Sequence, residues 1–243
     1  MSSLEPNSVG VILPAAGRGV RCGGDFPKQF INLGGQPLFT YSLETFSSLK
    51  EVGEIVLVLP EEHMNEYTAL ADTYLKLKMT RGGGRRWESV QNGFNSLSHG
   101  SKYVLIHDTA RPFIPRSVIR RCLEYLKEGK DTITALPAVN TVKDVRDDRI
   151  KKTLDRNRLI EVQTPQAFHR ETLKRAYDIF RERDEDGQDS FTTDEAGLVE
   201  SIGLPVYWTP GSRFAHKITD QEDLKWAEWM MCRIRKGEIA LDD

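Results

Sequence analysis

The sequence has few of the features that mark secreted, membrane or metal-binding proteins. Its three cysteines, Cys22, Cys122 and Cys232, are odd in number and far apart in 243 residues. That argues against a disulfide framework or a zinc ribbon and suits a reducing compartment. The five histidines show neither an HExxH motif nor clustered ligand spacing. No stretch approaches the ~18 consecutive apolar residues of a membrane-spanning helix. The opening MSSLEPNS lacks the basic segment and apolar run of a secretory signal, so we expect a cytoplasmic protein with no membrane partner.

An excess of charge of one sign is also missing. The chain has 34 Lys and Arg against 36 Asp and Glu, a formal net charge of −2, and no block of like charges. A general nucleic-acid binder would show a basic excess or stripe, so we expect no nucleic-acid partner. The hydrophobic content of 39% is ordinary for a soluble protein, and a chain of this length can bury a sizeable core.

Strand-like and helix-like segments alternate along the chain. Four short segments are almost continuously apolar, as strands buried on both faces of a parallel sheet are: 8–13, 54–60, 103–108 and 132–137. Amphipathic stretches lie between them; Phe39, Leu43 and Phe46 fall at helical offsets of 0, 4 and 7. This alternation predicts right-handed βαβ crossovers and an α/β fold with a doubly wound, mostly parallel, Rossmann-like sheet.

The pattern changes at residue 139. Residues 139–162 contain period-two stretches on either side of a polar turn at Asp147 and Asp148, which is typical of a β-hairpin. A lone two-stranded hairpin is marginally stable in water, so we expect this arm to pack on something else, such as a second subunit. The chain shows no internal repeat or flexible linker. We therefore predict a single domain, 1–243, with 139–162 as a protruding arm.

Helix boundaries can be predicted near the C-terminus. Thr192 with Glu195, and Thr219 with Glu222, fit the capping-box pattern, so we expect helices to begin at these threonines. The last helix should run to about Lys236, because Gly237 is a stop signal.

A glycine-rich loop, "PAAGRGVRCGGDFPKQF", follows the first strand. A bare turn at this place exposes backbone N–H groups at the carboxyl edge of the sheet, where such folds bind ligands. The loop does not match the dinucleotide fingerprint, because Cys22 stands where the third glycine belongs after Gly17 and Gly19. No Walker loop is present either. Arg21 and Lys28 are spaced to reach a triphosphate from two sides, and the alternative is a solvated turn with surface cations.

A second candidate segment is "IHDTARPF". Asp108 ends an apolar strand, so its carboxylate should lie at the same sheet edge as the glycine loop. There it could hold Mg²⁺ or a ribose hydroxyl, since Mg²⁺ often takes only one or two protein carboxylates plus phosphate oxygens. The alternative is a helix-capping or turn aspartate. Arg111 could be a ligand cation or a partner of Asp108.

A third segment, "TRGGGRRWESVQNGF", places another glycine turn before a helix. It leaves space for a flat base against bare backbone, and Ser89 could hydrogen-bond either the base or the loop. The alternative is an ordinary turn and helix start. Thr141, Arg156, Thr164 and Lys217, taken singly, are typical surface residues.

Seven segments nevertheless occur together and in order. "PAAGRGVR…PKQF", "GGGRRWESV", "HDTARPF", "DRNRL", "TPQAF", "TTDEAGLVE" and "HKIT" resemble the 2-C-methyl-D-erythritol 4-phosphate cytidylyltransferases of non-mevalonate isoprenoid synthesis. The resemblance implies a Rossmann-like nucleotidyltransferase fold and the reaction of CTP with methylerythritol phosphate to give the CDP-alcohol and diphosphate. It also implies Mg²⁺ as cofactor and a homodimer in which each 139–162 arm reaches over the partner's site.

The resemblance also assigns roles. It makes Arg21 and Lys28 stabilise the triphosphate in the transition state, while Arg156 and Lys217 hold the alcohol phosphate for in-line attack. Asp108 would contact substrate or metal. The remaining CTP-binding residues would be Ala15, Ala16, Gly17, Gly19, Gly83 and Ser89, and the remaining substrate-binding residues Arg111, Thr141 and Thr164.

Two positions depart from the family pattern, and alternatives stay open. Gly84 stands where a polar residue is common near the base, and Thr109 where alanine or glycine is common. A sister cytidylyltransferase acting on ribitol or ribulose 5-phosphate would share much of the pattern. A nicotinamide-dependent dehydrogenase is opposed by the broken fingerprint, and a non-catalytic nucleotide-binding module by the retained cations.

Overall fold

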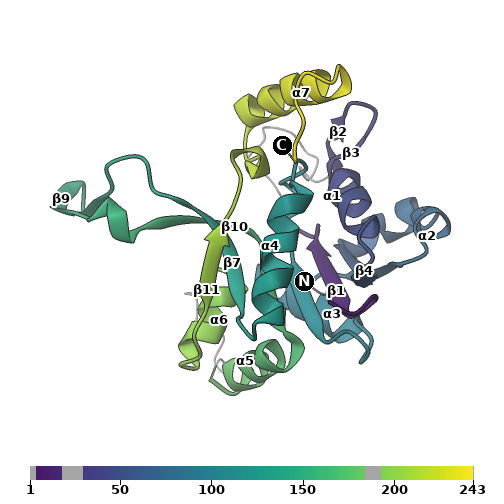
Figure 1. Cartoon of the computed structure of the whole chain (residues 1–243), viewed down its shortest axis with the longest axis horizontal. Coiled ribbons are helices and arrows are strands. Elements are labelled where there is room, and N and C mark those ends of the chain that lie inside the picture. Colours follow the sequence, from purple (N-terminus) through teal and green to yellow (C-terminus); the bar gives the residue numbers. More distant parts are fainter. Residues whose placement is uncertain (1–3, 18–29, 184–192, 243) are drawn as a thin grey trace.

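A seven-stranded sheet forms the centre of the computed structural model, which describes residues 4–17, 30–183 and 193–242 (Figure 1). Its strands, in spatial order, are β11 (Tyr207–Pro210), β7 (Thr132–Pro137), β10 (Ile160–His169), β6 (Tyr103–Ile106), β1 (Val9–Pro14), β4 (Val52–Leu59) and β5 (Leu77–Arg81). β1 pairs in parallel with β4 and β6, β4 with β5, and β7 with β11. β10 runs antiparallel to both of its neighbours, β6 and β7. The prediction of a doubly wound, mostly parallel sheet is confirmed.

Helices cover both faces of this sheet. The helices α1 (Leu38–Ser47) and α4 (Arg116–Lys127) pack on one face, and α3 (Arg86–Ser96), α5 (Arg170–Arg183) and α6 (Glu195–Ser201) on the other. Alternate residues of β1 enter the two cores: Val11 and Leu13 join the first and Ile12 the second, all fully buried. Burial of one such side chain contributes ~1.5–3 kcal/mol, which explains why this strand is apolar throughout.

The C-terminal helix closes one end of the molecule. α7 (Gln221–Arg235) packs Met230 and Met231 against β2 (Asn32–Leu33) and Phe113. Its expected end is confirmed by Gly237, which has a φ of +70°. Smaller elements complete the chain: β3 (Gln36–Pro37), α2 (Leu70–Thr73) and the 3-10 turns η3 (Glu61–Tyr67), η4 (Arg156–Arg158) and η5 (Arg213–Ala215).

The expected start of this last helix is wrong by one residue. The side chain of Asp220 caps α7 by accepting a hydrogen bond from the Asp223 amide at 2.9 Å. Thr219 instead donates its amide and its hydroxyl to the Asp223 carboxylate, at 2.7 and 2.6 Å. The expected start of α6 at Thr192 is wrong by two residues, because the cap is Asp194, whose side chain accepts from the Gly197 amide at 3.0 Å. Thr192 itself lies outside the described residues.

The arm is a β-hairpin that projects from the ends of β7 and β10 (Figure 1). β8 (Lys143–Arg146) pairs antiparallel with β9 (Arg149–Thr153), and the turn residues Asp147 and Asp148 have positive φ angles of 49° and 61°. Two positive φ angles fit the hairpin turns that match the twist of the strands. Every residue of β8 and β9 is exposed. The predicted hairpin is confirmed.

Within the described ranges, no helix combines the length and the apolar character needed to cross a membrane.

Candidate active site

A cleft of about 260 Å³ opens where β1, β5 and β6 end. Its lining comes from the first glycine loop, the 82–84 turn with α3, the turn after β6 and the C-terminal segment: Pro14, Ala16, Gly17, Gly83, Gly84, Arg85, Arg86, Ser89, Asp108, Thr109, Ala110 and Lys217. Of the CTP-binding residues expected from the sequence, Ala16, Gly17, Gly83, Ser89 and Asp108 line this cleft, and Ala15 is buried next to it. The carboxyl edge of the sheet therefore gathers them, as expected.

The 82–84 turn needs bare backbone because two segments approach closely there. A Cβ on Gly82 would lie 2.2 Å from the Cβ of Ala16, and one on Gly83 would lie 2.4 Å from the Cβ of Glu88. At Gly84 the nearest atom would be 3.4 Å away, an ordinary contact. The first two glycines are therefore fixed by packing, whereas the departure at Gly84 leaves room for a side chain.

The hydroxyl of Ser89 holds this turn. Oγ of Ser89 accepts a hydrogen bond from the Gly83 amide at 3.0 Å and donates to the Arg85 carbonyl at 3.2 Å. Of the two roles considered for Ser89, the structure shows the contact with the loop. A contact with a base stays a prediction.

The carboxylate of Asp108 lies among three cations. Oδ2 of Asp108 accepts a hydrogen bond from Nζ of Lys217 at 2.7 Å and lies 3.8 Å from Nε of Arg111. Oδ1 lies 3.6 Å from Arg86. Burial alone would raise the pKa of Asp108, but Arg86 and Lys217 outweigh burial and hold this pKa well below its ordinary value. Asp108 is therefore ionised.

A buried ion pair fixes Arg86 in the cleft. Arg86 is the first residue of α3, and its Nη1 lies 3.0 Å from both carboxylate oxygens of Glu195, the first residue of α6. The Glu195 side chain has no exposed surface. Burial raises its pKa, and the charge of Arg86 opposes that shift. The pair thus joins two helices and directs the other end of the guanidinium to Asp108.

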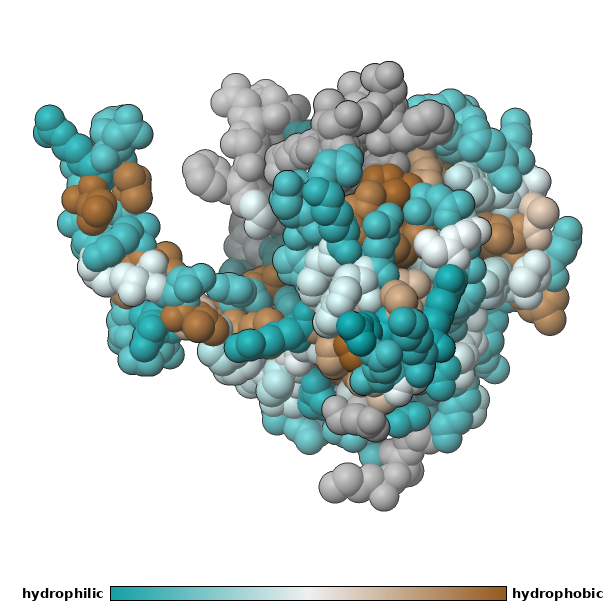
Figure 2. Space-filling view, turned by 90° about the horizontal axis from the view of Figure 1, so that it is seen from above, coloured by the Kyte–Doolittle hydropathy of each residue, from teal (hydrophilic) through white to brown (hydrophobic). Residues whose placement is uncertain are grey.

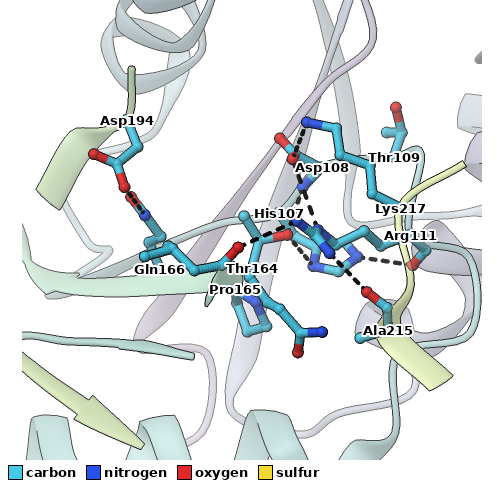
Figure 3. Close-up of polar contacts among 12 residues, drawn as sticks. His107, Asp108, Thr109, Arg111, Thr164, Pro165, Gln166, Asp194, Ala215 and Lys217 are labelled. Atoms are coloured by element: carbon cyan, nitrogen blue, oxygen red, sulfur yellow. Dashed lines mark hydrogen bonds and ion pairs between the residues drawn. The ribbon is translucent and has the colours of Figure 1, made fainter. Parts of the chain in front are cut away.

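Arg111 connects three segments behind the cleft (Figure 3). Its Nη1 donates to the Ala215 carbonyl at 2.8 Å, and its Nη2 donates to the Val162 carbonyl at 3.4 Å. Of the two roles considered for Arg111, the structure shows the partnership with Asp108. Its role as a substrate ligand stays a prediction.

Thr109 has a contact that explains the second departure. Its hydroxyl donates to the Pro14 carbonyl at 3.1 Å and so ties the turn after β6 to the end of β1. Alanine or glycine at this position would lack that hydrogen bond.

His107 is buried directly behind Asp108. Its Nε2 lies 3.1 Å from the Arg111 carbonyl and its Nδ1 lies 3.1 Å from Oγ1 of Thr164, which also accepts from the Asp108 amide at 3.0 Å (Figure 3). Burial lowers the pKa of His107 to about 4. The ring is therefore neutral at pH 7, and Thr164 contacts the turn after β6 rather than lining the cleft.

The remaining expected residues lie elsewhere. Arg156 and Thr141 are on the exposed arm, where Nη1 of Arg156 donates to the Val139 carbonyl at 3.0 Å, and neither lines this cleft. That Arg156 and Thr141 bind substrate in the site of a neighbouring subunit stays a prediction. Gly19, Arg21 and Lys28 lie outside the described residues.

Several site residues were not expected from the sequence: Arg86, His107, Gln166, Asp194 and Glu195. Gln166 donates to Asp194 at 2.7 Å and accepts from the Glu195 amide at 3.2 Å, so it orients the start of α6. Arg86 is the second residue after the glycine turn, and the other four lie in the "IHDTARPF", "TPQAF" and "TTDEAGLVE" segments. Their presence in these segments was the available signal.

Comparison with known proteins gives a consistent result. The model of the family described as 2-C-methyl-D-erythritol 4-phosphate cytidylyltransferase matches residues 9–233. A protein of that name from Carboxydothermus hydrogenoformans is 38% identical over 234 residues, which cover 95% of this chain and 98% of the relative. One from Bacteroides thetaiotaomicron is 37% identical over 220 residues, covering 88% and 95%.

Solved structures show the same similarity. The 4-diphosphocytidyl-2C-methyl-D-erythritol synthase of Anaerococcus prevotii has a TM-score of 0.81 at 28% identity and covers 93% of this chain and 96% of its own. The 2-C-methyl-D-erythritol 4-phosphate cytidylyltransferase of Thermus thermophilus has a TM-score of 0.73 at 30% identity, with coverages of 92% and 98%.

The neutral state of His107 predicts loss of stability in acid. In the unfolded chain this histidine becomes protonated below pH 6.5, whereas in the folded chain it stays neutral down to about pH 4. The free energy of unfolding should therefore fall by about 3 kcal/mol over that interval because of His107. Urea denaturation at a series of pH values measures this fall, and His107→Gln should remove it.

His169→Gln is the matched control. In the unmodified protein, the hydrogen bond between His169 and Asp131 raises the pKa of His169. The contribution of His169 to stability is therefore complete below pH 6.5 and is lost only as the pH rises through the pKa of the folded state. This variant should keep the acid slope of the unmodified protein. If the free energy of unfolding of His107→Gln falls in acid as steeply as that of the unmodified protein, His107 is not the group responsible for the fall.

Proposed function

The chain belongs to the 2-C-methyl-D-erythritol 4-phosphate cytidylyltransferase family, and we propose that it transfers the cytidylyl group of CTP to methylerythritol phosphate. It is a cytidylyltransferase, and the family acts in isoprenoid biosynthesis. The observation that supports the reaction most strongly is the family match over 9–233 together with the cleft at the carboxyl edge of the sheet. The comparisons give the ribitol or ribulose 5-phosphate alternative no support.

The proposed reaction is an in-line displacement at the α-phosphorus of CTP. An oxygen of the alcohol phosphate forms the new bond to phosphorus, the bond from the α-phosphorus to the bridging oxygen breaks, and diphosphate leaves with that electron pair. The attacking phosphate is already anionic, so no general base is needed. The protein has to bring two polyanions together and stabilise charge in the transition state.

The described residues suit the nucleotide side of this reaction. We place the cytosine against the 82–84 turn and Ser89, because Gly83, Gly84 and Ser89 line the cleft and Gly84 has room beside it. The triphosphate then faces Ala16, Gly17 and Lys217. Arg21 and Lys28 are proposed as its further cations on the basis of the family pattern.

Magnesium is a proposed cofactor, and Asp108 is suited to hold it. The hydrogen bond from Lys217 is made at Oδ2, whereas Oδ1 is 3.6 Å from Arg86, beyond hydrogen-bond distance, and the residue lines the cleft. Among the described residues there is no group of three or more His, Cys, Asp or Glu that could hold a metal. We therefore propose that Asp108 would hold the ion together with phosphate oxygens of the substrate. The ion would neutralise part of the triphosphate charge.

A homodimer through the arm is proposed to complete the substrate side. The arm exposes Val139, Val145, Ile150 and Val162, and apolar side chains are visible along it in Figure 2. A lone hairpin with exposed apolar side chains needs a partner surface. Arg156 and Thr141 lie outside their own cleft, so in this proposal they reach the cleft of the other subunit. There they would meet that subunit's own Lys217, with Arg111 and Thr164 behind it. The cytoplasmic location stays a prediction.

Release of diphosphate tests the reaction. The protein should release diphosphate from CTP and Mg²⁺ with methylerythritol phosphate, and at least tenfold more slowly with ribitol 5-phosphate or ribulose 5-phosphate. Replacing CTP by ATP, GTP or UTP in parallel reactions examines how strictly the base is selected without a side chain at Gly84. Faster turnover of a pentitol or pentulose phosphate would overturn the assigned substrate.

Mixing two inactive variants tests the shared site. Arg21→Ala and Arg156→Ala should each lower turnover by orders of magnitude, because each removes a charge that acts on phosphate. If the arm serves the partner, mixed dimers contain one site with both arginines intact, and about a quarter of the activity should return after subunit exchange. Arg149→Ala, on the exposed strand β9, is the control arm variant and should stay active. Absence of complementation in proven mixed dimers would contradict sharing.

A further inference from the structure

A chain of three hydrogen bonds passes through His107. The Asp108 amide donates to Oγ1 of Thr164 at 3.0 Å, Oγ1 of Thr164 lies 3.1 Å from Nδ1 of His107, and Nε2 of His107 lies 3.1 Å from the Arg111 carbonyl (Figure 3). His107 has no exposed surface, Thr164 and Arg111 are buried, and Asp108 is partly exposed.

The Arg111 carbonyl sets the donor and the acceptor of each of these hydrogen bonds. A carbonyl oxygen can only accept, so Nε2 of His107 must carry the proton that it shares with Arg111. The ring is buried beside the Phe46 ring, at 5.2 Å between centroids, in surroundings that favour the neutral form. Nδ1 is then an acceptor, the Thr164 hydroxyl donates to it, and the threonine oxygen keeps its lone pairs for the Asp108 amide.

The two ends of this series of hydrogen bonds, the Asp108 amide and the Arg111 carbonyl, are also the two ends of one turn. The turn closes with a hydrogen bond of 3.0 Å from the Arg111 amide to the Asp108 carbonyl. It places the Asp108 carboxylate 2.7 Å from Lys217, and the Arg111 guanidinium against the Ala215 carbonyl. One imidazole ring therefore spans the turn from inside and ties it to Thr164 on β10.

We propose that His107, through its hydrogen bonds to the Arg111 carbonyl and to Thr164, is a positioning residue that holds the 108–111 turn and thereby orients the Asp108 carboxylate in the cleft. It does not touch substrate, and it acts through Thr164 and the turn. The kinetic part of this inference rests on the proposed cytidylyltransferase function, whereas its structural part does not. The competing explanation is a core histidine whose loss lowers stability only.

Two replacements of His107 separate its two bonds. Glutamine carries a donor near the position of Nε2, so His107→Gln can keep the bond to Arg111 but loses the acceptor for Thr164. Asparagine carries an acceptor near the position of Nδ1, so His107→Asn can keep the bond to Thr164 but loses the donor to Arg111. Thr164→Val removes the hydroxyl at nearly constant volume.

The matched control is Thr134→Val. Thr134 is a fully buried threonine on β7 whose hydroxyl donates to the Pro165 carbonyl at 3.2 Å, next to Thr164 in the chain. This hydrogen bond goes to β10 and not to the 108–111 turn. This variant measures what the loss of a buried threonine hydroxyl does to stability and turnover at this place in the sheet.

Kinetics of the single and double variants test positioning. We expect Thr164→Val and His107→Gln each to lower kcat about tenfold, with KM for CTP changed less, and Thr134→Val to change kcat less than twofold. Thr164→Val should have its full tenfold effect in the His107→Asn background. Its effect should be smaller in the His107→Gln background, where the bond between Thr164 and His107 is already broken and only the bond from the Asp108 amide remains to be lost. Equal, independent effects in both backgrounds, or a loss confined to thermal stability, would overturn the proposal.

A spectroscopic measurement keeps the test independent of the reaction. Long-range ¹H–¹⁵N spectra of the unmodified protein should show His107 neutral and protonated at Nε2 at pH 7, and the Asp108 amide signal should shift alike in Thr164→Val and His107→Gln but not in Thr134→Val. A proton on Nδ1, or an unmoved Asp108 amide, would overturn the proposal even if the protein turns over CTP. If the unmodified protein proved inactive with methylerythritol phosphate, the assigned reaction would fail and these spectra would still decide the role of His107.

Discussion

Burying a carboxylate at the end of β6 is the constraint on which the rest of the site depends. An unpaired charge as buried as that of Asp108 would cost much free energy, so the fold has to place cations beside it. They come from three places: Arg86 from the start of α3, Arg111 from the turn itself and Lys217 from the C-terminal segment. Because Arg86 also pairs with Glu195, three cations face two carboxylates, which leaves a local excess of one positive charge beside bare backbone. A polyanionic nucleotide fits this arrangement without further rearrangement of the charges.

The same constraint explains the buried groups behind the cleft. Arg86 also pairs with Glu195, Gln166 accepts from the Glu195 amide, and His107 links the ends of the 108–111 turn. Partly satisfied polar groups in a low-dielectric interior are expensive, and fully connected ones become rigid. Rigidity is what a reaction between two repelling anions requires, because its catalysis depends on position and electrostatics.

The sequence predicted the fold and the cleft for reasons that can be stated residue by residue. Strands such as β1 are apolar on both faces because helices cover both faces, and Asp108 and Gly83 meet because both follow strand ends at one edge of the sheet. The antiparallel β10 was not foreseen, because its polar first half resembles the arm. The Arg86–Glu195 pair could not be found from periodicity, since the partners are 109 residues apart. The role proposed for Arg156 involves a second copy of the chain, which no pattern within one chain can position.

A crystal structure of the protein with CTP and Mg²⁺ tests the central claim most directly. The account predicts cytosine against the 82–84 turn near Ser89 and the triphosphate next to Lys217, with the Asp108 carboxylate facing the metal or the ribose. Density for the nucleotide in another part of the molecule, with this cleft filled only by water, would contradict it.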